Sequence, residues 1–447
     1  MKRTISPVRK IGGIIHVPGD KSIGHRAALL PILAQEAVKV RNFPDNADCR
    51  VSLEAARKLG VQIRTEVDGL VLTPPHHVSA PADTIFDCAN SGTTARLLSG
   101  IVAGSNIEAT ITGDKSLCAR PMKRIVDPLT RMGAELTTQD DHLPMTIRGR
   151  RLQDFEYQPP MASAQVKSAL LLAGLASGCA VTIREEKETR DHTEIMLHEL
   201  GASIVVRKVR PVRHPDPDDP RKTRMRMPES FRKEIVLAAG SRIGGGTIDI
   251  PGDISTAAFF FAAAAIARAT ITVEQVGLNP TRTAFLDHLK AIGCNVVISD
   301  RMVVSGEPRG NVTVTGRMLK GRKISGAATV GLIDEMPIVA VMAAFADGAT
   351  VIRDAGELRF KESDRLQATL ENLQEMGVKC GRLEDGLVVE GGTNHPGADF
   401  RSFGDHRIAM AFSVAALSLV GPSTVDDDSV VDISCPGFYD LLDTISI

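Results

Sequence analysis

The sequence has 447 residues, 43% of them hydrophobic, and a formal net charge of −1. This length predicts two or three domains, and the near-neutral charge excludes a global electrostatic attraction to nucleic acid or to an anionic membrane. The aromatic content of 4%, with no tryptophan, leaves few side chains on which bases could stack. We therefore expect no nucleic-acid partner and no membrane partner.

The cysteines and the N-terminal residues indicate in which cellular compartment the protein is found. Seven cysteines are scattered along the chain without a C-x-x-C pair, which argues against a disulfide framework and against a zinc site. The N-terminal stretch lacks the continuous apolar segment of a signal peptide, and no run of 18 apolar residues occurs. We expect a cytoplasmic protein.

The first distinctive stretch, V-P-G-D-K-S-I-G-H-R-A-A-L-L, covers residues 17–30. It places Lys21, His25 and Arg26 where an apolar helix is expected to begin. Cations at a helix N-terminus are locally unfavourable unless an anion lies among them. The stretch therefore predicts a binding site for an anionic ligand.

This arrangement of a polar loop and an Ala-rich apolar helix occurs six times. The repeats follow one another at intervals of ~70 to 90 residues, which is too long for a solenoid and is typical of repeated supersecondary units. One residue in each loop serves as an anchor: Ser22, Gly92, Ser163, Asp253, Asp334 and Asp405.

Each repeat continues in the same way after its apolar helix. In the second copy, residues 107–113 alternate as a strand, and residues 126–136 form an amphipathic helix that a glycine closes before the next strand. The pattern predicts strand, helix, strand, helix, strand, strand for every repeat. The sixth copy lacks its second half, and we expect N-terminal residues 4–17 to supply the missing strands, which places both chain ends in one domain.

The longest interval between anchors contains Arg207–Glu234, a segment rich in proline and charge. We predict an extended hairpin or loop inserted within a repeat. Its cations would suit a nucleic-acid patch, but the interleaved acids and the lack of aromatic residues favour a solvated surface loop. We assign it no chemistry.

Helix capping explains the Gly, Ser and Asp residues of the six loops, and for Ser163 and Asp253 alone it is the simpler explanation. Capping does not explain the basic residues, whereas a bound phosphate or carboxylate does. The basic residues in or beside these or related loops are Lys21, Arg26, Arg96, Arg120, Lys361, Arg365 and Arg407.

The stretch L-R-F-K-E-S-D-R-L, residues 358–366, places two carboxylates between two cations ahead of a helix. One explanation is a capping box in which Ser363 or Asp364 is the cap. The other is proton transfer on an anionic substrate, for which carboxylates beside cations are suited. Spacing alone leaves both open.

Eight motifs in order resemble the motif set of the 5-enolpyruvylshikimate-3-phosphate synthases over nearly the whole chain. S-A-Q-V-K-S-A together with K-E-S-D-R is similar to the second bacterial class of these enzymes. The motifs are P-G-D-K-S-I-G-H-R-A, N-S-G-T-T-A-R-L, R-P-M, S-A-Q-V-K-S-A-L-L-L-A-G-L, P-G-D-I-S-T-A-A-F, I-D-E-M-P-I-V-A, L-R-F-K-E-S-D-R-L and G-D-H-R-I-A-M-A-F.

The resemblance implies an α/β fold of two similar domains, each made of three βαβαββ units, which is the inverse α/β barrel of the enolpyruvyl transferases. It implies an active site in the interdomain cleft. We expect residues 1–18 plus 249–447 to form the domain on the phosphoenolpyruvate side. Residues 19–248 are expected to form the domain on the shikimate 3-phosphate side.

The resemblance also implies the reaction. The enolpyruvyl group of phosphoenolpyruvate is transferred to the 5-hydroxyl of shikimate 3-phosphate by addition and elimination through a tetrahedral intermediate, with release of phosphate, in chorismate and aromatic amino acid biosynthesis. It implies no cofactor and no metal, a monomeric enzyme, and a pocket that the inhibitor glyphosate can enter at Gly92.

Residue by residue, the resemblance assigns three sets of roles. Asp334 faces the 5-hydroxyl and Glu362 protonates the methylene carbon, and the catalytic residues are Lys21, Asp334 and Glu362. The residues expected to bind shikimate 3-phosphate are Lys21, Ser22, Arg26, Ser163, Gln165, Arg190, Asp334 and Lys361. The residues expected to bind phosphoenolpyruvate are Lys21, Asn90, Gly92, Thr93, Arg120, Gln165, Arg365 and Arg407.

Two other functions compete with this assignment. The sister family transfers enolpyruvate to UDP-N-acetylglucosamine. In it, Asn usually follows the loop lysine and a reactive Cys faces the site, whereas here Ser22 follows Lys21 and Cys118 lies two residues before Arg120. A non-catalytic phosphate-binding module of the same fold is the second alternative. One departure from the family pattern is Gly24, which stands where Ser is usual and is expected to loosen the first helix turn.

Overall fold

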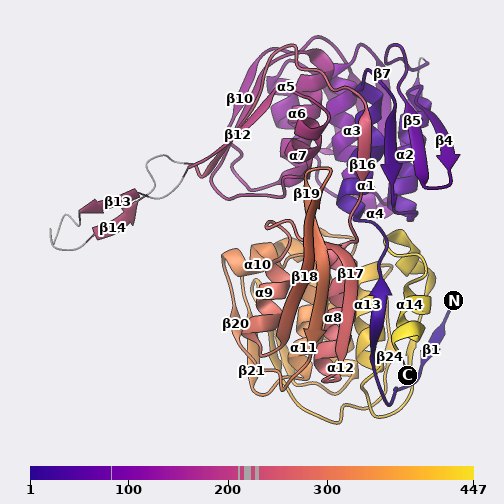
Figure 1. Ribbon diagram of the computed structural model, residues 1–447, viewed down its shortest axis with the longest axis vertical. Helices are drawn as coiled ribbons and strands as arrows, with labels where there is room; N and C mark the ends of the chain where they lie inside the picture. The colour runs from indigo at the N-terminus through magenta and orange to yellow at the C-terminus, as the bar shows by residue number, and fades with distance from the viewer. Residues whose placement is uncertain (82, 210–211, 216–222, 227–230, 447) are drawn as a thin grey trace. The chain divides into compact units, whose positions relative to one another are not determined.

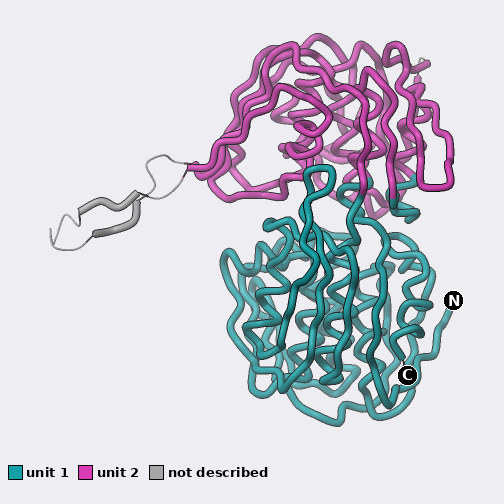
Figure 2. The backbone as a smooth tube through the Cα atoms, viewed as in Figure 1, with its two compact units in different colours: residues 1–24, 42–50, 250–447 teal, residues 25–41, 51–249 magenta. Residues whose placement is uncertain are grey.

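The computed structural model describes residues 1–81, 83–209, 212–215, 223–226 and 231–446 (Figure 1). The chain divides into two compact units, coloured separately in Figure 2. Unit 1 comprises Met1–Gly24, Asn42–Arg50 and Ile250–Ile447, and unit 2 comprises His25–Arg41 and Val51–Asp249.

Unit 2 contains three four-stranded sheets of identical topology. In each sheet an edge strand pairs in parallel with its neighbour, and the two remaining pairings are antiparallel. The first sheet is β16 (Gly246–Asp249), β3 (Val38–Arg41), β5 (Gly69–Thr73) and β4 (Gln62–Glu66). The second is β6 (Thr84–Asp87), β7 (Glu108–Thr112), β9 (His142–Arg148) and β8 (Glu135–Gln139). The third is β10 (Phe155–Tyr157), β11 (Val181–Glu185), β15 (Lys233–Leu237) and β12 (Ile204–Lys208).

Two apolar helices of unit 2 pack against each other with their backbones in near contact. They are α3 (Gly92–Gly104), in which all residues but Thr93 are buried, and α6 (Ala164–Ser177), which is buried from Val166 to Leu175. A Cβ added at Gly100 would lie 2.0 Å from the carbonyl oxygen of Ala169, so only glycine permits this approach. The other helices of unit 2 are α1 (Lys21–Leu29) and α2 (Ala47–Lys58), which both begin in unit 1, then α4 (Lys115–Cys118), α5 (Lys123–Arg131), α7 (His192–Glu199) and the 3-10 helix η1 (Leu30–Leu33).

The described residues of unit 1 form three further sheets. The first is β18 (Asn295–Val304), β19 (Glu307–Thr315), β17 (Thr270–Gly277) and β2 (Gly12–His16). The second is β20 (Lys323–Ile324), β21 (Ala349–Ile352), β23 (Gly386–Glu390) and β22 (Cys380–Leu383). The third has three strands, β1 (Arg3–Ile5), β25 (Ser423–Val425) and β24 (Asp399–Phe400).

The N-terminal residues supply strands to two different sheets. Strand β1 pairs with β25 and so completes the sixth repeat, as predicted, but β2 pairs in parallel with β17 of the fourth repeat. Strand β16, which precedes the fourth repeat in sequence, pairs with β3 of the first repeat. The first and fourth repeats have therefore exchanged their leading strands.

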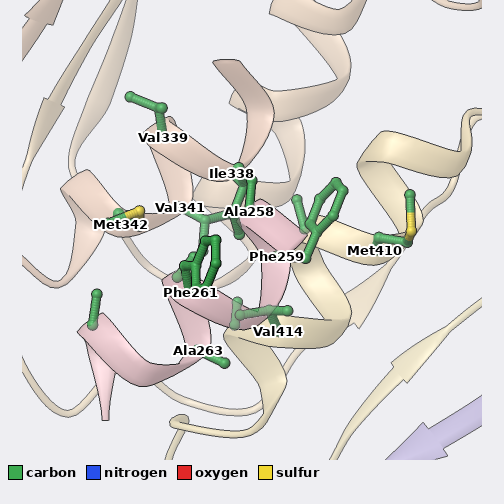
Figure 3. Close-up of a cluster of buried hydrophobic side chains, with 14 of the residues drawn as sticks. Ala258, Phe259, Phe261, Ala263, Ile338, Val339, Val341, Met342, Met410 and Val414 are labelled. Atoms are coloured by element: carbon green, nitrogen blue, oxygen red, sulfur yellow. The ribbon is translucent and has the colours of Figure 1, made fainter. Parts of the chain in front are cut away.

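Three apolar helices form the core of unit 1: α8 (Ile254–Ile266), α11 (Met336–Ala344) and α13 (His406–Ala416). Figure 3 shows their side chains meeting, among them Phe259, Val341 and Met410. Each fully buried large apolar side chain contributes ~1.5–3 kcal/mol. The remaining helices of unit 1 are α9 (Ala284–Ala291), α10 (Ala327–Gly331), α12 (Arg365–Glu375), α14 (Phe438–Ile445), η2 (Gly356–Phe360) and η3 (Ser429–Ile433).

The repeat pattern predicted from the sequence is confirmed in five copies, whereas the described sheet of the sixth copy has three strands because β2 pairs with β17. Glycines with positive φ close the amphipathic helices, for example Gly133 at +102° and Gly377 at +71°. Within the insertion, β13 (Val212–Pro215) and β14 (Thr223–Arg226) pair as antiparallel strands, and the ends of the segment belong to β12 and β15. Residues 210–211, 216–222 and 227–230 of the insertion lie outside the described residues. None of the helices in the described ranges combines the length and apolar character that a membrane span needs.

Candidate active site

Most of the predicted site residues lie at or shortly before the start of a helix, and they are divided between the two units. An α-helix N-terminus carries partial positive charge and unpaired N–H groups, which suits anions. Unit 1 holds Lys21, Ser22, Asp334, Lys361, Glu362, Arg365 and Arg407. Unit 2 holds Arg26, Asn90, Gly92, Thr93, Arg120, Ser163, Gln165 and Arg190.

Lys21 is the first residue of α1 and is held at both its ends. Its Nζ atom lies 2.9 Å from Oδ2 of Asp48, and its backbone N–H donates to Oδ2 of Asp253 at 3.1 Å. Burial lowers the pKa of Lys21, but the Asp48 and Glu362 carboxylates raise it, and the net pKa lies above the ordinary value. Lys21 is therefore a fixed cation at neutral pH.

Arg365 is the most enclosed cation of the site, with 1% of its side chain exposed. Its guanidinium donates to both carboxylate oxygens of Asp405, at 2.7 and 3.2 Å, and to Oε2 of Glu362 at 2.6 Å. Burial lowers the pKa of Arg365, while Asp405 and Glu362 raise it above its usual range. Asp405 also caps α13, because its Oδ1 accepts the N–H of Arg407.

The Asp334 carboxylate lies among cations just before α11. Nζ of Lys361 is 3.5 Å from its Oδ1, and Nη1 of Arg365 is 3.9 Å from the same atom. Arg407 donates to the backbone oxygen of Asp334 at 2.7 Å and faces Glu335 at 3.5 Å. Unit 1 thus brings Asp334 and Glu362 together with three of the predicted basic residues.

The stretch over residues 358–366 contains both a cap and a charge cluster. Asp364 is the N-cap of α12, since its Oδ1 accepts the N–H of Gln367 at 3.1 Å. Glu362 and Lys361 point instead to Arg365 and Asp334. The capping explanation is therefore confirmed for Asp364, and a role of Glu362 in proton transfer stays a prediction.

The N-S-G-T loop of unit 2 is joined to an arginine and to the start of α6. Nη2 of Arg120 donates to Oδ1 of Asn90 at 2.9 Å, and Nε2 of Gln165 donates to Oγ1 of Thr93 at 2.9 Å. A Cβ added at Gly92 would lie 2.7 Å from Nη1 of Arg96 and 3.2 Å from Nη1 of Arg120. Five predicted residues, Asn90, Gly92, Thr93, Arg120 and Gln165, therefore lie together.

A second group in unit 2 connects Arg26 with α6 and α7. Nε of Arg26 donates to Oγ1 of Thr193 at 2.6 Å, and its Nη2 donates to Oγ of Ser168 at 2.8 Å. Ser163 is the N-cap of α6, as the simpler explanation predicted. Arg190 is half-buried in the loop that precedes α7. Arg26 thus joins the helices whose first residues are Lys21, Ala164 and His192.

Sequence reasoning missed several residues that hold the site in place. Asp48 and Asp253 orient Lys21, and nothing in the local sequence marks Asp48 as its partner. His406 belongs to the G-D-H-R motif, yet its burial was not foreseen. Neither of its ring nitrogens has a hydrogen-bond partner among the described residues. Burial and Lys21 hold the pKa of His406 well below its usual value, so that the ring is neutral.

Gly24 makes a close contact that the sequence did not predict, and its effect on the first turn of α1 stays a prediction. A Cβ at this position would lie 2.4 Å from Cγ of Pro44 and 3.0 Å from Sγ of Cys49. The absence of a side chain is what allows the proline ring to pack against the helix. The glycine therefore serves a close contact.

The arrangement is suited to anions and to proton transfer. Buried guanidinium and ammonium groups are held by internal carboxylates, which preorganises them for phosphate or carboxylate groups. Among the described residues, no group of three or more His, Cys, Asp or Glu side chains is arranged to hold a metal ion. The chemistry that these charged side chains can supply is charge stabilisation and acid–base catalysis.

Comparison with known proteins identifies the relatives of the chain. Residues 5–226 and 227–442 match the family described as EPSP synthase (3-phosphoshikimate 1-carboxyvinyltransferase). The chain is 39% identical to the 3-phosphoshikimate 1-carboxyvinyltransferase of Desulforamulus reducens, with 100% of each chain covered. It is 43% identical to that of Anaeromyxobacter sp. (strain K), with 99% and 95% covered. A solved EPSP synthase from Acinetobacter baumannii is similar with a TM-score of 0.82 and 36% identity, over 100% of this chain and 98% of that one.

Proposed function

The chain belongs to the EPSP synthase family, and we propose how its residues carry out the reaction of that family. The enzyme transfers the enolpyruvyl group of phosphoenolpyruvate to the 5-hydroxyl of shikimate 3-phosphate and releases phosphate, in aromatic amino acid biosynthesis. In the addition step the 5-oxygen bonds to C2 of phosphoenolpyruvate and a proton adds to C3. In the elimination step the C2–O bond to phosphate breaks and C3 gives a proton back.

Asp334 and Glu362 are proposed as the groups that move these protons. Asp334 accepts the proton of the 5-hydroxyl, and Lys361 at 3.5 Å stabilises its carboxylate. Glu362 donates the proton to C3 and recovers it in the elimination step. Placed acid–base groups of this kind contribute roughly 10²–10⁴-fold to a rate. Lys21 is the cation proposed to contact both substrates.

The basic residues are proposed to bind the charged groups of the substrates. A guanidinium presents two parallel N–H groups that match phosphate and carboxylate oxygens. The residues proposed for phosphoenolpyruvate are Lys21, Asn90, Gly92, Thr93, Arg120, Gln165, Arg365 and Arg407. Those proposed for shikimate 3-phosphate are Lys21, Ser22, Arg26, Ser163, Gln165, Arg190, Asp334 and Lys361.

Both units are proposed to act on the same pair of substrates. Residues 1–18 and 249–447 are the phosphoenolpyruvate side, and residues 19–248 are the shikimate 3-phosphate side. Holding two reactants together in the correct geometry is worth about 7–11 kcal/mol of the barrier. This is the benefit that binding residues in both units would provide.

The observation that carries the assignment of roles is the cluster around Asp334 and Glu362. These two carboxylates share Arg365, at 3.9 and 2.6 Å, and Lys361 flanks the first of them. A module that only binds phosphate has no use for two carboxylates beside its cations, because they weaken the attraction for an anion. The cluster therefore favours catalysis over simple binding.

The first test is phosphate release from phosphoenolpyruvate by the purified enzyme, with shikimate 3-phosphate or UDP-N-acetylglucosamine as the acceptor. Release with shikimate 3-phosphate alone, and its loss in Glu362→Ala, is the expected result. Release with the sugar nucleotide alone would show that the enzyme belongs functionally to the sister family. An unaltered rate in Glu362→Ala would remove that residue from the mechanism.

Three further properties complete the proposal. The enzyme is proposed to be cytoplasmic and monomeric, and light scattering of the purified protein tests the monomeric state. Glyphosate is proposed to enter the phosphoenolpyruvate pocket, because Gly92 places no side chain beside Arg96 and Arg120. Inhibition that is not competitive with phosphoenolpyruvate would contradict this.

A further inference from the structure

Two P-G-D loops of unit 1 pair with each other, although they are far apart in sequence. The first is Pro18–Asp20 and the second is Pro251–Asp253. The N–H of Asp20 donates to the oxygen of Pro251 at 2.8 Å, and the N–H of Asp253 donates to the oxygen of Pro18 at 2.9 Å. The two loops therefore form a symmetric pair, and each aspartate begins a buried helix.

The pair of loops determines where Lys21 lies. Asp20 accepts the N–H of Ile23 at 3.0 Å and thereby starts the helix that carries Lys21. Asp253, from the second loop, accepts the N–H of Lys21 itself at 3.1 Å. The two carboxylates together hold the backbone of the first turn of this helix.

Arg282 lies in the segment between β17 and α9 and touches both loops. Its side chain is 5% exposed. Nη1 donates to Oδ2 of Asp20 at 3.1 Å and to Oγ of Ser22 at 3.5 Å. Nη2 donates to Oγ of Ser255 at 2.7 Å and lies 3.5 Å from Oδ1 of Asp253. One planar group thus joins both aspartates and the serine two positions after each.

The hydrogen bonds continue from Arg282 to the turn that holds Asp334. The hydroxyl of Ser255 donates to Oε1 of Glu335. Glu335 faces Nη1 of Arg407 at 3.5 Å, and the same nitrogen donates to the backbone oxygen of Asp334 at 2.7 Å. A continuous set of contacts therefore connects the Lys21 loop with the Asp334 turn.

Charge balance gives Arg282 a second role. Burial and the neighbouring carboxylate of Asp20 raise the pKa of Asp253, and Arg282 is the cation that opposes them most. Without Arg282, Asp20 and Asp253 would face each other in a buried setting where like charges repel strongly. Such repulsion would separate the two loops.

We propose that Arg282 is a positioning residue of the enzyme: it fixes the paired loops so that Lys21 and Ser22 on one side and Asp334 on the other keep a single geometry. The proposal rests on the proposed function, because those residues matter only if they act on the substrates. Arg282 itself is not assigned a contact with substrate.

The test compares four variants in the phosphate-release assay, with kcat and KM referred to the concentration of folded enzyme. Arg282→Met removes both the charge and the planar set of N–H donors. Arg282→Lys keeps the charge but not the planar set of donors. Asp20→Asn combined with Arg282→Met removes the repulsion that the single change creates. Arg353→Met is the matched control, since it removes an arginine of the same unit that forms an exposed ion pair with Asp385.

We expect Arg282→Met to lower kcat/KM by about 100-fold, the cost of a displacement near 1 Å in an active site. Arg282→Lys should fall between this variant and the wild-type enzyme. Adding Asp20→Asn to Arg282→Met should restore at least ~10-fold, because the two residues are coupled. The control should retain the wild-type rate.

If the wild-type enzyme is active, two outcomes would overturn this inference and leave the proposed function in place. The first is wild-type kcat/KM in Arg282→Met. The second is a double variant no more active per folded molecule than Arg282→Met, which would mean that Arg282 only stabilises the fold. If Arg282→Met does not fold, the test rests on Arg282→Lys. A wild-type kcat/KM in Arg282→Lys would then overturn the inference. A wild-type enzyme that releases no phosphate would overturn the proposed function as well.

Discussion

The guanidinium of Arg365 donates to both carboxylate oxygens of Asp405, which is fully buried and belongs to the next helix of the fold. Asp405 also accepts the N–H of Arg407 at 2.9 Å. One carboxylate therefore fixes two of the arginines proposed to bind phosphoenolpyruvate. A substitution can remove the negative charge of Asp405 and keep the oxygen that caps α13.

Asp405→Asn keeps an oxygen that caps α13 but removes the charge that holds Arg365. We expect KM for phosphoenolpyruvate to rise by at least ~10-fold, and the free energy of unfolding to fall by up to ~3–5 kcal/mol, because a buried cation loses its fully buried partner and keeps only Glu362 nearby. Steady-state kinetics and urea unfolding measure the two effects. Asp364→Asn is the matched control, since Asp364 caps α12 and lies 3.9 Å from the partly exposed Arg382. Equal effects in both variants would contradict the role of Asp405.

Gly92→Ala places a methyl group 2.7 Å from Nη1 of Arg96 and 3.2 Å from Nη1 of Arg120. The ends of flexible side chains can move aside, so we expect little loss of stability but a displaced Arg120. KM for phosphoenolpyruvate should rise, and glyphosate should inhibit more weakly. Gly356→Ala is the control, because a Cβ there has no atom within 4 Å. Wild-type KM and inhibition in Gly92→Ala would show that Arg120 does not set this pocket.

Lys167 is buried in α6 and pairs with Glu185 at 3.2 Å and with Glu194 at 2.8 Å. Lys167→Met leaves both carboxylates short of a cation, so we expect a loss of ~3–5 kcal/mol in the free energy of unfolding. Lys208→Met should cost less than ~1 kcal/mol, because Lys208 forms an exposed pair with Glu188. Urea unfolding at neutral pH compares the two.

The loss of stability in Lys167→Met is expected to depend on pH. Burial raises the pKa of Glu194, but Lys167 and Lys233 lower it to a net value below the ordinary one. In the wild-type enzyme this stabilisation is therefore present above pH ~4.5 and is lost as the pH falls through the folded-state pKa. In Lys167→Met the deficit should shrink toward acidic pH, where Glu194 can take up a proton. A deficit that is constant with pH would argue for a packing effect.

His288 makes unit 1 less stable in mild acid. Burial and Arg322 lower the pKa of His288 from 6.5 to about 4. Below pH ~6.5 the unfolded chain binds a proton that the folded chain does not, so stability falls by up to about 3 kcal/mol as the pH approaches 4. His288→Gln should show a shallower decline in urea unfolding between pH 7 and 4.5. An identical slope would assign the decline to other groups, such as His406.

The repeat, its helices and its caps were predictable because they are local. An apolar helix after a polar loop, and a glycine that closes the following amphipathic helix, can be recognised within about 30 residues of sequence. The exchange of β2 and β16 between the first and fourth repeats was not predictable, because each strand has the same pattern as the one it replaces. Only the pairing in space distinguishes them.

The same limit explains which site residues were found. Lys21, Asp334 and Glu362 stand in motifs, so the sequence marks them. Arg282 stands outside every motif quoted above, and its importance comes from the pairing of two loops more than 200 residues apart. The sequence did not explain Gly24 either. A side chain at this position would clash with the ring of Pro44, and only folding brings that ring against the helix.

The close contact of α3 with α6 has a consequence for the two loops that begin these helices. Gly100 follows Gly92 by eight residues, a distance of about 12 Å along a helix. A helix is nearly rigid over that length. The close approach of Gly100 to Ala169 therefore fixes the spacing between the N-terminal ends of α3 and α6. It sets how far Thr93 stands from Gln165. The spacing of the two loops proposed to bind substrate therefore depends on Gly100 and Ala169, two residues that were assigned no contact with substrate.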